Sequence, residues 1–385
     1  MLSLDTLLIR NKMKLINAFK QRYKEKIVHH NERFEWVDVA KGLGMFLICY
    51  GHALYAGFNP TINHLIYAFH VAFFFALSGF VFVVPKNEKF LTFLRKKAVR
   101  ILIPLSIYIF LGLIIALVVD HIYDPLTLLR YFFYYDGTYF WNQACWFFIT
   151  LFFVYIFGYL FNLPNRKMYL KIILLVSFLV IGYLLYVSRP YIPEEVNPFS
   201  KFGIDRTIIV MVFFIFGAIL KDIHKLINFS NNHFFLRPIS FTSLGLWILF
   251  GYYLNPKVSI YGRSLGNYWF FIASSIFGTI FFFIFSIYIA KLRILSPILK
   301  LWGKNTLLIG GTNYLYFFMT WLFIVIFSPF GIPYTWAADI IIPFYTIIVM
   351  LIYIPIGFLI DRYLPYVSGS DPYFYKELRM KRNQK

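Results

Sequence analysis

Apolar runs long enough to cross a bilayer recur along this chain and constrain its fold more than any other feature. A helix needs about 20 apolar residues to span a hydrocarbon core roughly 30 Å thick. Strand alternation is absent, which argues against a membrane barrel. The predicted fold class is an all-α integral membrane protein with about ten transmembrane helices. We place these helices at 37–55, 62–84, 101–119, 145–162, 168–187, 206–220, 238–254, 268–289, 306–327 and 339–360.

Composition supports a lipid environment. Hydrophobic residues make up 60% of the 385 residues and the mean hydropathy is +0.68, which leaves too little polar surface for a water-soluble globule. The first 36 residues lack an apolar core with a small-residue cleavage site, so we expect no removable signal peptide. Cys49 and Cys145 have neither metal-ligand nor disulfide spacing, and we predict no metal site.

The net charge of +20 is distributed in a way that indicates topology. Most of the 37 Lys and Arg residues fall in alternate connections, which predicts that both termini are cytoplasmic. Juxtamembrane cations also attract anionic headgroups by about 1 kcal/mol each. Topology and this attraction account for the positive charge, so we predict membrane lipids as partners and no nucleic acid. We predict a multi-pass protein of a bacterial-type plasma membrane, that is, the inner or cytoplasmic membrane. The cation-rich connections are 1–36, 85–100, 163–171, 221–237, 290–304 and 361–385.

The predicted domain organisation has three parts: a basic cytoplasmic segment over 1–36, a ten-helix transmembrane domain over 37–360, and a basic cytoplasmic tail over 361–385. The outer loops are short except for about 120–144 and 188–205. The chemistry must therefore use loop or intramembrane residues.

The first predicted helix carries an aligned set of ionisable residues. At about 100° per residue, Asp38, Lys41 and His52 fall within roughly 60° of one another, and Lys41 and His52 are about 16 Å apart along the axis. Polar groups inside an apolar helix are costly and mark functional sites. His52 can act as a general acid or base, or it can be a packing histidine bonded to a neighbouring helix.

The second predicted helix carries His70 near mid-depth and Ser78-Gly79 near its inner end. Ser-Gly in a membrane helix most often permits close helix approach. No Gly-x-Ser-x-Gly elbow surrounds Ser78, so nucleophilic serine catalysis is weakly indicated.

A basic run enters the third predicted helix, which Pro104 interrupts. Arg95, Lys97 and Arg100 in this run suit the phosphates of coenzyme A, although topology alone also explains such cations. On the outer side, the aromatic loop 131–146 ends at Trp146, and Arg263 lies in a later connection. These residues can contact a saccharide, or the aromatic residues can simply anchor the chain at the interface.

The region from Arg33 to Phe82 resembles the opening of the acyltransferase 3 family of membrane acyltransferases. The resemblance rests on a Lys-x10-His pattern with a preceding Asp and on Phe-His, an aromatic run and Ser-Gly. It continues through Arg100 and Pro104, Trp146-Phe-Phe and Gly303-Lys304-Asn305. The first two elements are matched by Asp38, Lys41 and His52 and by Phe69-His70, Phe73–Phe75 and Ser78-Gly79.

This resemblance implies transfer of an acyl group, often acetyl, from cytoplasmic acyl-coenzyme A to a hydroxyl of an extracytoplasmic or lipid-linked glycan. The Phe-His and Ser-Gly pattern is similar to the fucose O-acetylase-like branch. Many members have a second histidine where this chain has Asn313, which cannot accept a proton at neutral pH and so places more weight on His52. Acetyl-coenzyme A or another acyl-coenzyme A is expected as a donor substrate, with no permanently bound cofactor.

The resemblance implies a specific set of site residues. His52 and Asp38 are the expected catalytic residues, with His52 as base for the acceptor. Asp38 either fixes the inner end of the helix together with Lys41 or simply pairs with Lys41 or Arg100. A rival interpretation is a transporter or flippase of a lipid-linked saccharide, because ten helices with buried polar groups would also serve that purpose. We expect donor contacts from Lys41, Arg95, Lys97 and Arg100, and acceptor contacts from His70, Ser78, Trp146 and Arg263.

Overall fold

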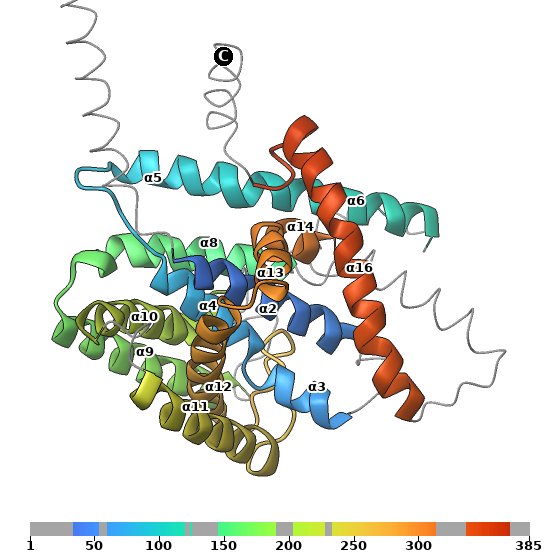
Figure 1. Cartoon of the computed structure of the whole chain (residues 1–385). Coiled ribbons are helices and arrows are strands. Elements are labelled where there is room, and N and C mark those ends of the chain that lie inside the picture. The colour runs from blue at the N-terminus through green and yellow to red at the C-terminus, as the bar shows by residue number, and fades with distance from the viewer. Residues whose placement is uncertain are drawn as a thin grey trace, which may run out of the picture.

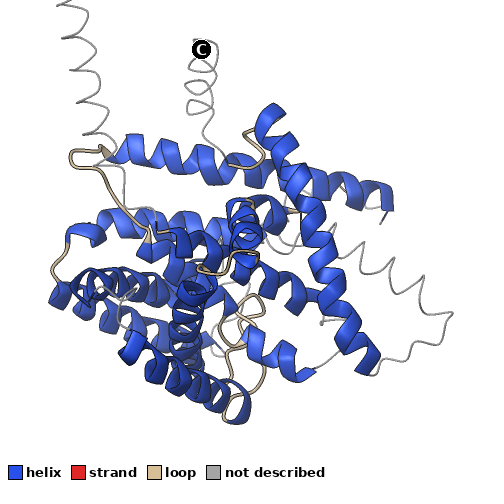
Figure 2. Ribbon diagram, in the orientation of Figure 1, coloured by secondary structure: helices blue, strands red, loops and turns tan. Residues whose placement is uncertain are grey.

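The computed structural model describes residues 34–53, 60–119, 124, 145–189, 203–227, 233–312 and 336–369. Within them every regular element is a helix (Figure 2), apart from an isolated backbone bridge between Ser259 and Ser264. The predicted all-α fold class is therefore confirmed for these residues. A helix bonds its backbone groups within one segment, which is what a chain surrounded by lipid requires.

The helices follow one another in the order shown in Figure 1. Short π-helical turns join α5 to α6 and extend α11. The bounds are α2 Glu35–Ala53, α3 Pro60–Tyr67, α4 His70–Phe80, α5 Phe90–Lys97, η2 Ala98–Leu102, α6 Ile103–Val119, α8 Cys145–Leu160, η3 Leu163–Asn165, α9 Met168–Ser188, α10 Ile204–Ile227, α11 His233–Ile248, η7 Leu249–Tyr253, α12 Tyr268–Ile289, α13 Leu295–Lys304, α14 Thr306–Gly311 and α16 Trp336–Tyr363.

Within the described residues, 6 segments are long and apolar enough to cross a membrane. The chain is thus a helical protein of membrane type, whereas the predicted count of ten is not confirmed. The exposed face of α9 is strongly apolar, as expected of a lipid-facing helix. The 6 segments are Pro60–Phe80, Met168–Ser188, Ile204–His224, Phe234–Tyr253, Tyr268–Ile289 and Ile342–Tyr363.

The second predicted helix is broken in the structure. It forms α3 and α4, separated at Ala68 and Phe69. The carbonyl of Ala68 accepts hydrogen bonds from the hydroxyls of Ser274 at 3.2 Å and Ser275 at 2.9 Å, both on α12. These two donors satisfy a carbonyl at the break, and they come from a part of the chain that local periodicity does not reveal.

Two helices form where we predicted connections. α5 and α13 lie within the cation-rich segments 85–100 and 290–304 and are amphipathic, so hydropathy windows miss them. In Figure 1, α5 and α6 run in one line along the top of the molecule. The third predicted helix therefore begins earlier than expected, and a π-helical turn just before Pro104 takes the place of an interruption.

Glycines bring α4 and α10 into backbone contact. A Cβ added at Gly79 would lie 1.9 Å from the carbonyl oxygen of Phe214, and one at Gly217 would lie 1.9 Å from that of Ala76. Only glycine permits this approach. Gly79 thus has the helix-packing role that the Ser-Gly pair predicted, and the close contact holds α4 in the centre of the molecule (Figure 1).

A second glycine pair brings α2 and α13 together. A Cβ at Gly42 would lie 2.0 Å from the Leu299 oxygen, and one at Gly303 would lie 2.0 Å from the Asp38 oxygen. The amide of Asn305 donates to the Leu301 carbonyl at 3.1 Å at the end of α13. Gly303 of the Gly-Lys-Asn motif therefore packs on the helix that carries Lys41 and His52, and Asn305 caps the end of α13.

Some predicted features fall outside the described residues. These are the aromatic loop up to Ala144, Asn313 and the remainder of the ninth predicted helix, most of the segments 1–36 and 188–205, and the tail from Ser370 onward.

Candidate functional site

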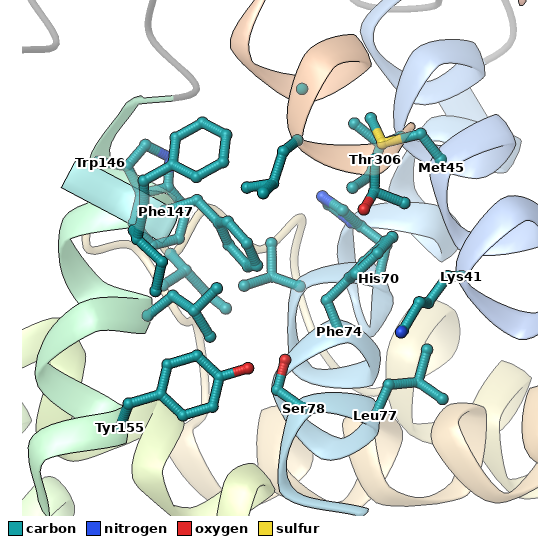
Figure 3. Close-up of a pocket in the computed structure, with 18 of the residues that line it drawn as sticks. Lys41, Met45, His70, Phe74, Leu77, Ser78, Trp146, Phe147, Tyr155 and Thr306 are labelled. Carbon is teal, nitrogen blue, oxygen red and sulfur yellow. The ribbon is translucent and has the colours of Figure 1, made fainter. Parts of the chain in front are cut away.

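A cavity of about 560 Å³ lies between α2, α4, α8, α14 and the connection between η7 and α12. Its size is typical of small-molecule sites, and much of its wall is apolar. Figure 3 shows its lining residues projecting from separate helices toward a common space. The polar and basic lining residues are Lys41, His52, Tyr67, His70, Ser78, Lys97, Arg100, Tyr155, Ser259, Tyr261 and Thr306.

Two imidazoles reach this cavity beside one tyrosine. His52 lies in the last turn of α2, and its Nδ1 is 3.3 Å from the hydroxyl of Tyr67. His70 begins α4, directly after the helix break, and its Nδ1 is 2.7 Å from the carbonyl oxygen of Ile66. The ring of Tyr67 contacts both imidazoles edge to face, with centroids 6.1 Å from His52 and 5.0 Å from His70. The break between α3 and α4 thus groups these residues.

Asp38 and Lys41, which are aligned on one face of α2, differ in their position relative to the cavity. Lys41 lines the cavity (Figure 3), whereas Asp38 does not. Their charged groups are 3.9 Å apart, so Asp38 can orient Lys41 from behind. In the structure Asp38 therefore pairs with Lys41 from outside the cavity lining.

One end of the cavity holds a caged ammonium group. Nζ of Lys97 lies 3.8 Å from the ring centroid of Tyr155, 5.5 Å from that of Phe93 and 5.9 Å from that of Phe82. Aromatic faces attract such a cation. Burial and the Arg100 guanidinium lower the pKa of the Lys97 ammonium to about 7, against an opposing effect of Glu88.

The other cations of the basic run differ in their placement. Arg100 lines the cavity next to Lys97, whereas Arg95 is exposed and outside the lining. Lys96 forms an exposed ion pair with Glu88 at 2.5 Å. Lys97 and Arg100 are thus the cations of this run that the structure brings to the cavity.

The neighbouring residues Ser78 and Gly79 have different roles, one in the cavity lining and one in helix packing. Gly79 packs on α10, while Ser78 lines the cavity, where its hydroxyl and that of Tyr155 point toward one another (Figure 3). Together they form a polar patch beside Lys97.

The opposite end of the cavity is bounded by aromatic rings. Trp146 at the start of α8 and Tyr261 of the connection line it, and the buried guanidinium of Arg206 lies 5.4 Å and 5.9 Å from their ring centroids. Lys257 lies over Tyr67, with Nζ 5.0 Å from the ring centroid. This end therefore offers flat aromatic faces next to cations.

Arg263, which we predicted to bind substrate, does not line this cavity. Its Nε donates to Asp205 at 2.6 Å, and its carbonyl accepts from Arg189 at 3.0 Å. Its backbone has a positive φ of 56°. The contacts with Asp205 and Arg189 hold the connection that carries Ser259 and Tyr261.

Sequence reasoning missed several lining residues. Tyr155, Ser259, Tyr261 and Thr306 were not singled out. Tyr155 had a usable signal, because it is a polar residue in the apolar run of α8. A second signal was the i,i+4 spacing of Phe93 and Lys97, which places an aromatic ring beside the ammonium on one helix face.

Comparison with known proteins gives one family match. A model described as an acyltransferase domain matches residues 34–357, which spans the helices described above. Neither curated proteins nor solved structures gave a match. The match covers most of the chain and includes every residue that lines the cavity. The chain therefore belongs to the acyltransferase 3 family and is a membrane acyltransferase by family.

Proposed function

We propose that this protein is an O-acyltransferase, in the first instance an O-acetyltransferase, that moves an acyl group from acyl-coenzyme A to a hydroxyl of an extracytoplasmic or lipid-linked glycan. One observation carries the proposal. A single cavity joins a cationic end at Lys97 and Arg100 to an aromatic end at Trp146 and Tyr261. Imidazoles lie in the same lining, where two substrates entering from opposite ends would meet.

The cationic end suits the donor. Coenzyme A carries phosphates, for which a guanidinium fork and an ammonium are the preferred partners. Lys97 and Arg100 would hold these phosphates, and Arg95 would attract them at the exposed surface. The apolar wall would take the pantetheine arm toward Lys41 and the imidazoles. Acyl-coenzyme A is then a substrate that leaves as coenzyme A.

The aromatic end suits a saccharide. Sugar rings have apolar faces that pack on aromatic side chains, and Trp146, Tyr261 and Tyr67 present such rings. The similarity of Phe69-His70 and Ser78-Gly79 to the fucose O-acetylase-like branch supports a sugar hydroxyl as acceptor. With both termini cytoplasmic, as the distribution of cations predicts, this end faces outward in the plasma membrane.

The chemistry requires one proton acceptor. The acceptor oxygen attacks the thioester carbon, the hydroxyl proton moves to an imidazole, and the carbon–sulfur bond breaks. The sulfur leaves with its electron pair and takes up the proton, giving an ester and free coenzyme A. His52 and His70 both line the cavity and are the imidazoles available for this chemistry, and Asp38 would orient Lys41 at the other end of α2.

Donor binding can be tested on the purified protein. A ligand that binds only the folded state raises the melting temperature, by an amount that grows with its concentration over Kd. We expect acetyl-coenzyme A to protect the wild type and to protect an Arg100→Gln variant much less. If acetyl-, propionyl- and succinyl-coenzyme A all leave the melting temperature unchanged, the donor site is not where we propose it.

Transfer is tested by the acetyl content of surface glycans from cells expressing wild type or His52→Ala at equal membrane levels. We expect the acetyl groups to be lost in the variant while the glycan still reaches the surface. Persistent acetylation with loss of surface glycan would contradict an acyltransferase and favour a transporter of a lipid-linked saccharide.

A further inference from the structure

The tautomer of His70 follows from its hydrogen bond. Its Nδ1 lies 2.7 Å from the carbonyl oxygen of Ile66, and a carbonyl oxygen can only accept. Nδ1 therefore carries a proton. A neutral imidazole holds one ring proton, so Nε2 of His70 keeps a lone pair. The side chain is only 6% exposed and lines the cavity, and no hydrogen bond joins Nε2 to any residue in the described part of the chain.

His52 is placed differently. Its Nδ1 is shared with the hydroxyl of Tyr67, a group that can donate as well as accept. Nζ of Lys257 lies 5.0 Å from the ring centroid of Tyr67, and a nearby cation strengthens a phenol as a hydrogen-bond donor. When Tyr67 donates to Nδ1, the ring proton of His52 is on Nε2. His52 is then a donor, whereas His70 is an acceptor.

We propose that His70 is the catalytic base of the transfer and that His52, oriented by Tyr67, donates from Nε2 to the developing oxyanion of the thioester. This inference rests on the proposed function and divides its chemistry between two residues. The two imidazoles contact the ring of the same tyrosine and line one cavity, so both can reach the same reacting group.

The steps balance without a further reactant. The acceptor hydroxyl gives its proton to Nε2 of His70 while its oxygen forms a bond to the thioester carbon. The carbonyl oxygen becomes an oxyanion that accepts a hydrogen bond from Nε2 of His52. The carbon–sulfur bond then breaks, sulfur keeps the electron pair, and His70 returns the proton to it. Ester and thiol are formed, and both imidazoles are neutral as at the start.

The test compares two amide variants of His70. In His70→Asn the side-chain N–H can replace Nδ1 and keep the hydrogen bond to Ile66, but nothing replaces Nε2. In His70→Gln the longer amide reaches the Nε2 position with an oxygen that accepts a hydrogen bond but is not a base at neutral pH. Both variants are assayed for melting temperature, protection by acetyl-coenzyme A and glycan acetylation at equal membrane levels.

We expect both variants to remain protected by acetyl-coenzyme A and to lose acetyl transfer at least about 100-fold, the usual contribution of a general base. Added imidazole should restore part of the activity to His70→Ala, which a merely structural role would not allow. Transfer within about threefold of wild type in His70→Asn would overturn the proposal, as would full activity in His70→Gln. If these results are obtained while the wild type acetylates glycan, the proposed function still holds and only the role of His70 is refuted. A wild type that neither acetylates glycan nor is protected by acetyl-coenzyme A contradicts the proposed function itself.

Discussion

Lys97 combines an aromatic cage with a pKa near neutrality, and both properties come from its burial at one end of the cavity. Three rings replace water around its ammonium, and Arg100 adds a like charge. Because the folded pKa of about 7 lies below the ordinary 10.5, the unfolded chain binds more protons between these values. The contribution of Lys97 to the free energy of unfolding therefore rises with pH across this window.

Donor affinity should show the opposite trend. Above pH 7 Lys97 loses its charge, so the wild type should bind acetyl-coenzyme A about tenfold more weakly at pH 8.5 than at pH 6, which corresponds to roughly 1.4 kcal/mol. Isothermal titration across this range measures the change. The control is Lys97→Arg, whose guanidinium stays charged. An equally steep decline in Lys97→Arg would assign the pH dependence to the ligand or to another group.

The residues that sequence alone identified are those whose polarity conflicts with an apolar run. Lys41, His52 and His70 were singled out on this ground, and the structure brings them to one cavity. Asp38 and Arg263 were also singled out, but they form ion pairs outside the lining. The partner of Arg263 is Asp205, and this pairing between distant segments is invisible in the sequence. The tautomer of His70 was equally hidden, since it depends on the backbone at a helix break.

At the scale of elements, the close contact between α4 and α10 depends on glycine at positions 79 and 217, where a Cβ atom would clash with the opposite backbone. Gly79→Ala would place a Cβ against the Phe214 carbonyl, so the backbones must separate. We expect a loss of about 1–3 kcal/mol or more, as for other overpacked interiors, seen as a lower melting temperature in detergent. Gly245→Ala on α11 is the matched control, because nothing lies within 4 Å of its added Cβ. Equal melting temperatures for the two variants would contradict the packing described here.

The contact between α9 and α10 contains an ion pair, and we expect replacement of its two residues to destabilise the protein by different amounts. Nζ of Lys171 lies 2.7 Å from Asp222, and the side chains are 2% and 28% exposed. Asp222→Asn leaves a buried ammonium without its counter-ion and should cost about 3 kcal/mol. Lys171→Met leaves a carboxylate that water can reach and should cost less. Thermal unfolding that ranks the two variants in the reverse order would refute this asymmetry.

Hydropathy predicted the long elements well and the short ones poorly. The bounds 268–289 coincide with α12, because an apolar run is delimited there by Asn267, whose side chain accepts hydrogen bonds from the backbone amides of Trp269 and Phe270. α13 was missed because one face is polar. The break between α3 and α4 was missed because the two serines of α12 that satisfy its free carbonyl are distant in sequence.

At the scale of the molecule, the proposed donor and acceptor ends must face opposite sides of the membrane. In a background of Cys49→Ala and Cys145→Ala, we expect a membrane-impermeant maleimide to label Ser264→Cys in intact cells. Lys86→Cys, in the connection between α4 and α5, should be labelled only after the membrane is opened. Both positions are exposed in the structure, so access to the reagent is not limiting. The reverse labelling pattern would invert the topology and exclude a cytoplasmic donor.

The cavity lining extends along the chain from Lys41 to Gly310, and this separation has a consequence for biosynthesis. Translation delivers α2 and α4 to the membrane first, before the connection between η7 and α12 and the helix α14 have been synthesised. A nascent chain arrested before Ser259 thus has His52 and His70 but lacks the part of the lining that the connection and α14 provide. On the proposed function, acyl transfer becomes possible only late in synthesis, and a chain terminated before that point would be inactive.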